Sequence, residues 1–349
     1  MSFENFWGNP HVTATIEQML AQDRMAQTLL FSGPEGVGKA TLARRIGQRL
    51  LSHAELIERD DLSLAENLET VAERERWPSE KRNEDPLVFA SHPDFLTFAP
   101  DGPLRQITIQ QTRLLKERAL YLPHRGKHRV FLVDRVDRAN EQAANSLLKI
   151  FEEPPEHLLV IMTAENAYDL LPTIRSRAVP FHFAPLVADQ MGAFVNARGL
   201  DQPERRIALS AGSPGVATSL DLEVFDKRRA AMLMLLKAAA GVVPFGAWSS
   251  VSEGIGRSKA DKLDYYLKVL YDLLRDLVIL RETGGTAAAN VSIKNEDIRR
   301  ELQPLAARVP FSWIRKAVEK VDQIVDLLRR NIQKTIALDA LIVELRGAL

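Results

Sequence analysis

A glycine-rich turn between an apolar strand and a helix constrains this chain more than any other feature. Thr28–Ser32 is a short apolar run, which is typical of a buried strand. A loop follows at once, made of Gly33, Pro34, Glu35, Gly36, Val37, Gly38 and Lys39. Glycines here let backbone N–H groups turn inward around a phosphate, and the helix that follows favours negative charge at its N-terminus. Strand, loop and helix therefore predict the start of a βαβ unit with a phosphate-binding P-loop.

The loop departs from the usual P-loop pattern at its last position. Lys39 would reach the β- and γ-phosphates of a nucleotide. The next residue normally offers a Ser or Thr hydroxyl to Mg²⁺, but here it is Ala40. Thr41 comes one residue later, where the turn of the helix points its hydroxyl away. We therefore expect a P-loop fold with weak ATP binding, and the part played by Mg²⁺ stays open.

Strand and helix patterns alternate along the first 185 residues. Strands are expected at 94–98, 129–134, 158–163 and 179–183, and helices at 11–24, 108–121, 140–151 and 167–175. Such alternation predicts an α/β domain over 1–185, with a parallel sheet covered by helices on both faces. After Pro185 the strand patterns stop. We expect a small helical domain over 186–222 and an all-α domain with longer amphipathic helices over 223–349.

Composition narrows the function classes. The chain has 349 residues and 0 cysteines, which excludes disulfides and any Cys-ligated zinc or iron–sulfur site. Its 46 basic residues cancel its 46 acidic ones, whereas a general polyanion binder would be basic. The N-terminal residues lack the features of a secretory signal, and no apolar stretch is long enough to span a bilayer. We expect a cytoplasmic protein without a membrane partner or zinc, and we assign no residue as a metal ligand.

Residues 55–85 differ from their surroundings because they are densely charged and poor in apolar side chains. Pro78 and Pro86 interrupt the stretch. This pattern predicts a solvated insertion, partly helical, that lies outside the core and is dispensable for folding.

A second phosphate-site motif ends the strand at 129–134. Val130–Val133 is a continuous apolar run, and it is followed by Asp134 as in a Walker B motif, whose aspartate holds the water shell of Mg²⁺. A hydrolysing ATPase of this type has a glutamate next, which orients the attacking water. This chain has Arg135, and a guanidinium stays charged and cannot act as a base.

Several segments together resemble the bacterial clamp-loader AAA+ subunits along nearly the whole chain. They are Asn140–Pro155, Thr173–Ala178, Asn331–Leu341, Trp7–Asn9 and Ser91–Asp94. The second of these is similar to the family's Ser-Arg-Cys motif, with Ala178 in the cysteine place. The segment 55–85 stands where many members of the family carry a four-cysteine zinc module, so the resemblance implies that this zinc is absent here.

The resemblance implies roles for individual residues. Arg177 matches an arginine finger that reaches the γ-phosphate held by a neighbouring subunit, and Arg175 is the alternative candidate beside it. Thr163 matches the sensor-1 place, although a strand-end threonine explains it equally well. The sensor-2 arginine of active members would fall within 212–217, where this chain has no arginine. The expected nucleotide contacts are thus residues 33–41, Asp134 and Thr163.

The function implied is that of a non-hydrolysing member of a mixed AAA+ pentamer that loads the sliding clamp onto primed DNA. Its partners would be the gamma/tau and delta subunits, and its C-terminal helices would join a collar. One alternative is an active AAA+ ATPase, such as gamma/tau or a helicase motor. Ala40, Arg135 and the missing sensor-2 arginine oppose it. A small-molecule P-loop kinase would leave the helical C-terminal third without a role.

Overall fold

A six-stranded sheet organises the N-terminal part of the chain in the computed structural model, which describes residues 3, 5–257, 262–284, 293–328 and 333–348. The strand order is β2-β3-β4-β5-β1-β6. The strands are β1 (Thr28–Ser32), β2 (Phe89–His92), β3 (Phe95–Phe98), β4 (Arg129–Val133), β5 (Leu158–Ala164) and β6 (Val179–His182). All neighbouring strands are parallel except β2 and β3. The predicted parallel sheet is confirmed, and β2 is an antiparallel edge strand that the sequence analysis missed.

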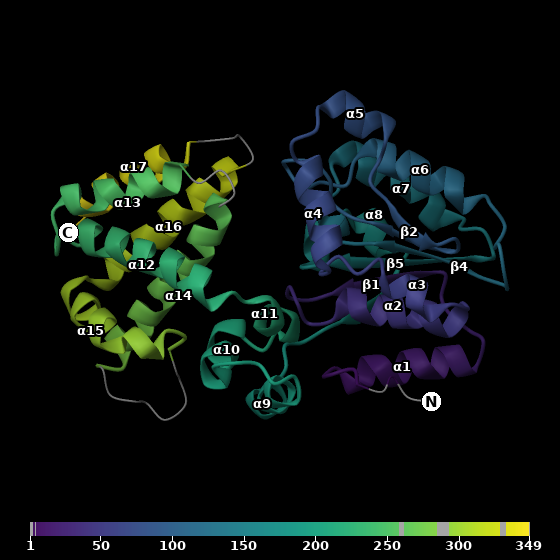
Figure 1. Cartoon of the computed structure of the whole chain (residues 1–349), viewed down its shortest axis with the longest axis horizontal. Coiled ribbons are helices and arrows are strands. Elements are labelled where there is room, and N and C mark those ends of the chain that lie inside the picture. Colours follow the sequence, from purple (N-terminus) through teal and green to yellow (C-terminus); the bar gives the residue numbers. More distant parts are fainter. Residues whose placement is uncertain (1–2, 4, 258–261, 285–292, 329–332, 349) are drawn as a thin grey trace. The chain divides into compact units, whose positions relative to one another are not determined.

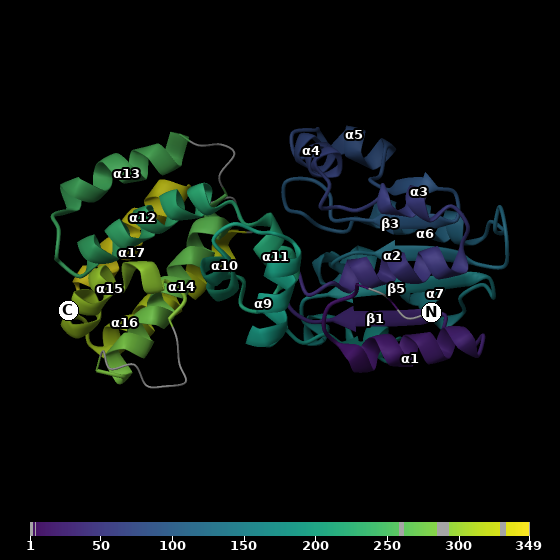
Figure 2. The same ribbon diagram turned by 60° about the horizontal axis from the view of Figure 1, so that its bottom comes forward.

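Helices cover both faces of the sheet (Figures 1 and 2). Strand side chains alternate between the faces, so Leu29 and Phe31 enter one apolar core and Leu30 enters the other. The first core is completed by α1 (Pro10–Ala21), α2 (Lys39–Leu50) and α3 (Ala54–Glu58). The second is completed by α6 (Ile109–Ala119), α7 (Glu141–Glu152) and α8 (Pro172–Arg175).

The register of the central strands brings the carboxyl ends of β1, β4 and β5 to one edge. Phe31 of β1 pairs with Thr163 of β5, and Val133 of β4 pairs with Met162 of β5. The P-loop after β1, Asp134 after β4 and Thr163 in β5 therefore lie at the same edge of the sheet, where ligands of open α/β sheets usually bind.

The charged segment 55–85 is folded against the sheet domain, which corrects the expectation of an insertion outside the core. It forms α3, α4 (Ala65–Arg74) and α5 (Ser79–Glu84). Ile57 is fully buried in the core beside α2, and Val71 packs with Leu87 and Ala99. A few apolar side chains at the right places are enough to attach this stretch, although its average composition is polar.

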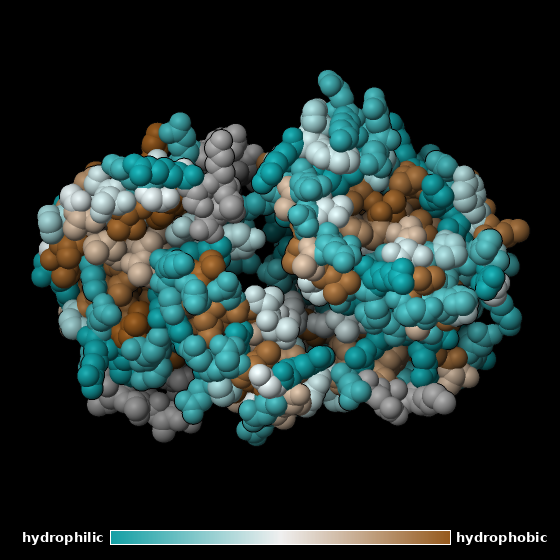
Figure 3. Space-filling model, viewed as in Figure 1, coloured by the Kyte–Doolittle hydropathy of each residue, from teal (hydrophilic) through white to brown (hydrophobic). Residues whose placement is uncertain are grey.

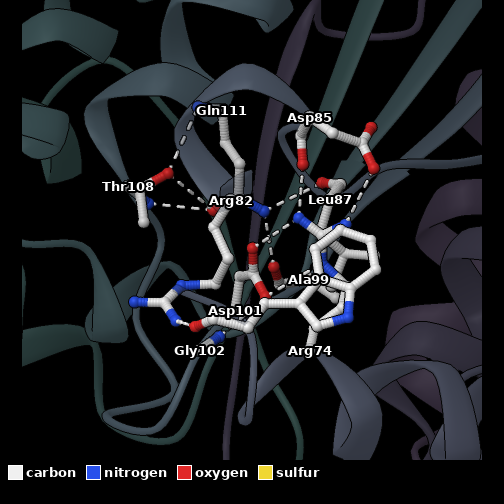
Figure 4. A network of polar contacts seen from close by, with 10 residues as sticks. Arg74, Arg82, Asp85, Leu87, Ala99, Asp101, Gly102, Thr108 and Gln111 are labelled. Atoms are coloured by element: carbon white, nitrogen blue, oxygen red, sulfur yellow. Dashed lines mark hydrogen bonds and ion pairs between the residues drawn. The ribbon is translucent and has the colours of Figure 1, made fainter. Parts of the chain in front are cut away.

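A buried ionic network fastens the same segment to the loop after β3 (Figure 4). The Arg74 guanidinium donates to both carboxylate oxygens of Asp101, at 3.1 and 2.9 Å, and to Asp85 Oδ2 at 3.2 Å. It lies over the Trp77 ring, 4.6 Å from the centroid. Burial has the largest single effect on the pKa of Arg74 and would lower it, but the hydrogen bonds and charges of Asp101 and Asp85 together raise it. This attachment is made by charged side chains, which the composition of the segment led us to expect in solvent.

Three short helices follow the sheet: α9 (Ala188–Ala197), α10 (Pro203–Ser210) and α11 (Pro214–Ser219). The chain divides into two compact units, one of Met1–Pro203 with Ser210–Ser219, the other of Glu204–Leu209 with Leu220–Leu349. The helices expected in 186–222 are thus present, and their grouping as a separate lid stays a prediction.

The C-terminal unit is entirely helical among its described residues. Its longer helices are α12 (Leu222–Ala239), α13 (Phe245–Arg257), α14 (Leu263–Glu282), α15 (Arg299–Arg308), α16 (Phe311–Leu328) and α17 (Lys334–Arg346). They share one apolar core around Trp248 and Trp313, whose indole N–H groups donate to Asp339 Oδ1 at 2.6 Å and Leu345 O at 2.9 Å. The predicted amphipathic helices are confirmed, while residues 331–332 of the C-terminal motif lie outside the described residues.

The face drawn in Figure 3 is mainly hydrophilic, with smaller apolar areas on both units. Within the described part of the chain, no helix is both long and apolar enough to cross a membrane.

Candidate functional site: a phosphate loop and an exposed arginine

The P-loop has the backbone shape that an anion site needs. Gly33, Gly36 and Gly38 have φ values of 145°, 77° and 98°, a region that favours glycine. No atom of the described residues accepts a hydrogen bond from the backbone N–H groups of Gly36, Val37, Gly38 or Lys39. These donors precede or begin α2, so the loop offers a nest of free N–H groups at a helix N-terminus, as phosphate binding requires.

Lys39 is held inside this loop. Its ammonium group donates to Gly33 O and Pro34 O, both at 2.6 Å, and the residue is only 9% exposed. An ammonium group has three protons, so one donor is left for a ligand. Burial lowers the pKa of Lys39, while Asp134 and Glu165 partly offset this effect. Lys39 thus lies inside the P-loop with one donor free, and its contact with a phosphate stays a prediction.

A distant segment of the same unit packs on the outer side of the P-loop. Ser213 Oγ donates to Glu35 O at 2.7 Å, and the Gly215 N–H donates to Gly36 O at 2.8 Å. A Cβ atom on Gly215 would lie 2.9 Å from Gly36 Cα, so only glycine allows this approach. The sequence analysis examined 212–217 only for a missing arginine and found no signal for this contact.

Thr163 and Asp134 are brought together, and a hydrogen bond between them uses the one proton of the threonine hydroxyl. Thr163 Oγ1 donates its one proton to Asp134 Oδ1 at 2.6 Å and accepts from the Arg135 N–H at 2.8 Å. In this arrangement the hydroxyl has no proton left to donate to a γ-phosphate. The sensor-1 role of Thr163 stays a prediction, and the geometry favours the structural alternative.

Arg135 is the residue whose surroundings the sequence analysis did not foresee. Its backbone is left-handed, with φ 54°, and its guanidinium pairs with the carboxylate of Glu165. The same Nη2 lies 3.9 Å from Glu35 Oε1 in the P-loop. Burial alone would lower the pKa of Arg135, but Glu35 and Glu165 raise it, so the side chain remains a cation. A permanent cation thus occupies the place of the water-orienting glutamate.

The residues at this edge fit a phosphate chain but not a magnesium ion. Ala40 has no hydroxyl, and one oxygen of Asp134 is engaged by Thr163. No group of three His, Asp or Glu side chains suited to a metal exists among the described residues. The free N–H groups and Lys39 are donors suited to an anion, whereas position 40 lacks the hydroxyl that usually binds the metal.

Arg177 lies between α8 and β6 and is one-third exposed. Its guanidinium donates to Thr173 O at 2.9 Å and to Glu152 Oε1 at 2.6 Å. In the part of the chain that is described, no contact joins it to the P-loop of its own chain. Arg175 instead lies 5.0 Å from the ring centroid of Tyr168. Within this chain Arg177 therefore caps a helix carbonyl and pairs with an acid.

Comparison with known proteins identifies the family. The model of the family described as DNA polymerase III, delta subunit, matches residues 8–187. The DNA polymerase III subunit gamma/tau of Mycobacterium bovis is 29% identical over 353 positions, covering 92% of this chain and 56% of the relative. The chain therefore spans little more than half the length of that relative. The delta' subunit of Pseudomonas aeruginosa is 26% identical over 352 positions, covering 96% of both chains.

Among solved structures, the chain is similar to a gamma-subunit-related protein of Thermotoga maritima, with 17% identity and a TM-score of 0.43 over 96% of this chain and 98% of that one. The RuvB branch migration motor of the same organism gives 14% identity and a TM-score of 0.42, with 81% and 78% covered. The matched family model, which spans more than half of the sequence and contains the whole P-loop edge, decides the assignment. The chain belongs to the DNA polymerase III delta-subunit family.

Proposed function

We propose that this chain is the delta-prime subunit of the clamp loader, a rigid AAA+ member that does not hydrolyse ATP itself. The observation that carries the proposal is Arg135, a charged guanidinium paired with Glu165 where a hydrolysing subunit has a base. Ala40 removes the metal hydroxyl as well. The likeness to the delta' subunit of P. aeruginosa over 96% of both chains supports the same reading.

The alternative is an active subunit of the gamma/tau type, because the gamma/tau relative is 29% identical. That likeness covers only 56% of the relative. An active site would need a base, a metal ligand and a sensor arginine, and the residues present at 135, 40 and 212–217 provide none of the three. We therefore prefer the non-hydrolysing role.

The contribution of the chain to catalysis would be Arg177, given in trans to a neighbouring gamma/tau subunit. Its side chain is one-third exposed, and its partner Glu152 is about half exposed, at 47%. Such an ion pair is weak, because water screens both charges. The guanidinium can thus exchange Glu152 for a γ-phosphate, where a planar cation stabilises the charge that spreads over the transferred group.

Within the complex, this arrangement assigns the chain a supporting part in an ATP-driven cycle that opens the sliding clamp and closes it on primed DNA. Hydrolysis would take place in the gamma/tau neighbour, with the delta subunit as a further partner, as part of the cytoplasmic DNA polymerase III holoenzyme. The P-loop of this chain would bind ATP weakly or not take part.

The test is the ATPase activity of the complex reconstituted with gamma/tau and delta, stimulated by clamp and primed DNA. Arg177→Ala should assemble normally, as checked by gel filtration, and should lower turnover at the adjacent site by about 10³-fold or more. Other active sites would keep part of the total rate. Arg177→Lys should also fail, because a lysine lacks the planar fork.

Arg175→Ala is the matched control, because Arg175 lies two residues away and contacts only the exposed Tyr168 ring in the described structure. It should leave turnover unchanged. Wild-type turnover from a fully assembled Arg177→Ala complex would refute the proposed finger, and a loss confined to Arg175→Ala would transfer the role to that residue.

A further inference from the structure

Four features of the P-loop edge determine which donors are available to a bound phosphate chain: the loop N–H groups, Lys39, Thr163 and Ala40. The free N–H groups of the loop and the third proton of Lys39 are open donors. Thr163 has committed its proton to Asp134, and Ala40 offers none. The phosphate nearest to β4 and β5 would therefore lack both a metal ion and a sensor hydroxyl. A triphosphate carries its highest charge there, so another cation has to compensate it.

We propose that Arg135 is this cation, so that the P-loop of this chain binds the γ-phosphate of a nucleoside triphosphate without a divalent metal ion. The inference rests on the proposed function, because it assumes a P-loop that binds but does not hydrolyse. A guanidinium suits the task, since its planar fork presents parallel N–H donors to phosphate oxygens.

The position of Arg135 supports this role. Its backbone N–H is fixed by Thr163 Oγ1 at 2.8 Å, next to the Walker B aspartate. Its Nη2 lies 3.9 Å from Glu35 Oε1, so the guanidinium reaches from the sheet edge to the P-loop itself. The side chain is one-third exposed, at 33%, and is therefore accessible to a ligand.

The contacts of Arg135 leave room for a phosphate. A guanidinium has five N–H donors, and among the described residues the only hydrogen bond recorded from this side chain goes to Glu165. The contact to Glu35 is longer than a hydrogen bond, so it does not occupy one of these donors. Glu165 would stay as the group that orients the guanidinium.

Charge gives a second reason. Asp134, Asp137, Glu35 and Glu165 place four carboxylates around the site, and each of them acts on Lys39 or Arg135. Without Arg135 they would repel a triphosphate, because Lys39 alone cannot compensate them. With it, two cations, Lys39 and Arg135, lie at the P-loop edge to compensate these charges.

The experiment is a calorimetric titration of the full chain with ATP, ADP and inorganic tripolyphosphate, each in EDTA and in excess Mg²⁺. The wild type should bind ATP and tripolyphosphate about equally well under both conditions. Arg135→Gln should weaken ATP and tripolyphosphate in EDTA by about 10-fold to 100-fold, the range expected for a charged hydrogen bond. The loss should be smaller for ADP, which lacks the γ-phosphate.

The matched control is Arg138→Gln, because Arg138 is exposed, lies three residues further along and has no recorded side-chain partner in the described structure. It should bind all three probes like the wild type, and circular dichroism should show that both variants are folded. Because the titration reads only this chain, its failure leaves the Arg177 test in the complex standing.

Three results would overturn the inference. One is a wild type that loses ATP affinity more than about tenfold in EDTA, since the site would then depend on metal. Another is an Arg135→Gln variant that binds ATP as well as the wild type, which would show that Arg135 contributes nothing, or better, which would show that Arg135 opposes nucleotide binding. The third is a wild type that binds none of the three probes.

Discussion

Replacing Arg74 by methionine tests whether the segment 55–85 is part of the folded core. The Arg74 side chain is 5% exposed and that of its partner Asp101 is 2% exposed. Removal of one member of such a pair leaves the other charge buried, which costs about 3–5 kcal/mol of unfolding free energy. Asp101 Oδ1 keeps the Gly102 N–H at 2.7 Å, and methionine fills most of the arginine's volume. We therefore expect a loss near the lower end, about 3 kcal/mol.

The assay is urea unfolding followed by circular dichroism, combined with hydrogen exchange to assign the loss to residues 54–106. Arg76→Met is the control, because Arg76 lies on the exposed side of the same turn and should change stability by less than about 0.5 kcal/mol. Adding Asp101→Asn to Arg74→Met should restore part of the loss, since it removes the buried charge. An Arg74→Met chain as stable as the Arg76→Met control would refute the reasoning and restore the view of 55–85 as a solvated insertion.

Two further predictions concern the P-loop. The isolated chain should hydrolyse ATP no faster than background, because Arg135 cannot act as a base; turnover that saturates with ATP and disappears in Lys39→Ala would contradict this. Because burial lowers the pKa of Lys39 from its ordinary 10.5, tripolyphosphate affinity should be full below the lowered pKa and should decline as pH rises through it, before pH 10.5 is reached. Titrations at constant ionic strength from about pH 8 upward measure this, and an affinity that stays flat to pH 10.5 would count against it.

Much of the α/β domain follows from local patterns. The apolar runs of β1, β4 and β5 are continuous because both faces of these strands are buried, and such runs are visible in the sequence. β2 was missed because two of its four residues are exposed, so no apolar run marks it. A strand can thus be predicted from its sequence only where burial requires apolar residues along it.

The predictions failed mainly at charged residues, because the sequence does not show which charged side chains form ion pairs in the folded chain. Arg74 meets Asp101 across 27 residues, and Arg135 meets Glu165 across 30. The contact between Ser213 and Glu35 joins positions 178 residues apart. The motifs predicted that the P-loop, Asp134 and Thr163 lie at one edge of the sheet, and the structure brings them together there. They did not reveal that the Thr163 hydroxyl donates its proton to Asp134, because this hydrogen bond depends on the register of β4 and β5.

The close approach of segment 212–217 to the P-loop bears on how such a subunit changes over evolutionary time. In this segment the resemblance to hydrolysing subunits places an arginine. A Cβ atom at Gly212 would lie 2.5 Å from Leu186 O, and one at Gly215 would lie 2.9 Å from Gly36 Cα. At either position a side chain would have to move backbone, so an arginine there would first damage the fold. On the proposed function, hydrolysis therefore cannot return through one arginine substitution at either glycine, because the backbone around the P-loop or Leu186 would have to shift first.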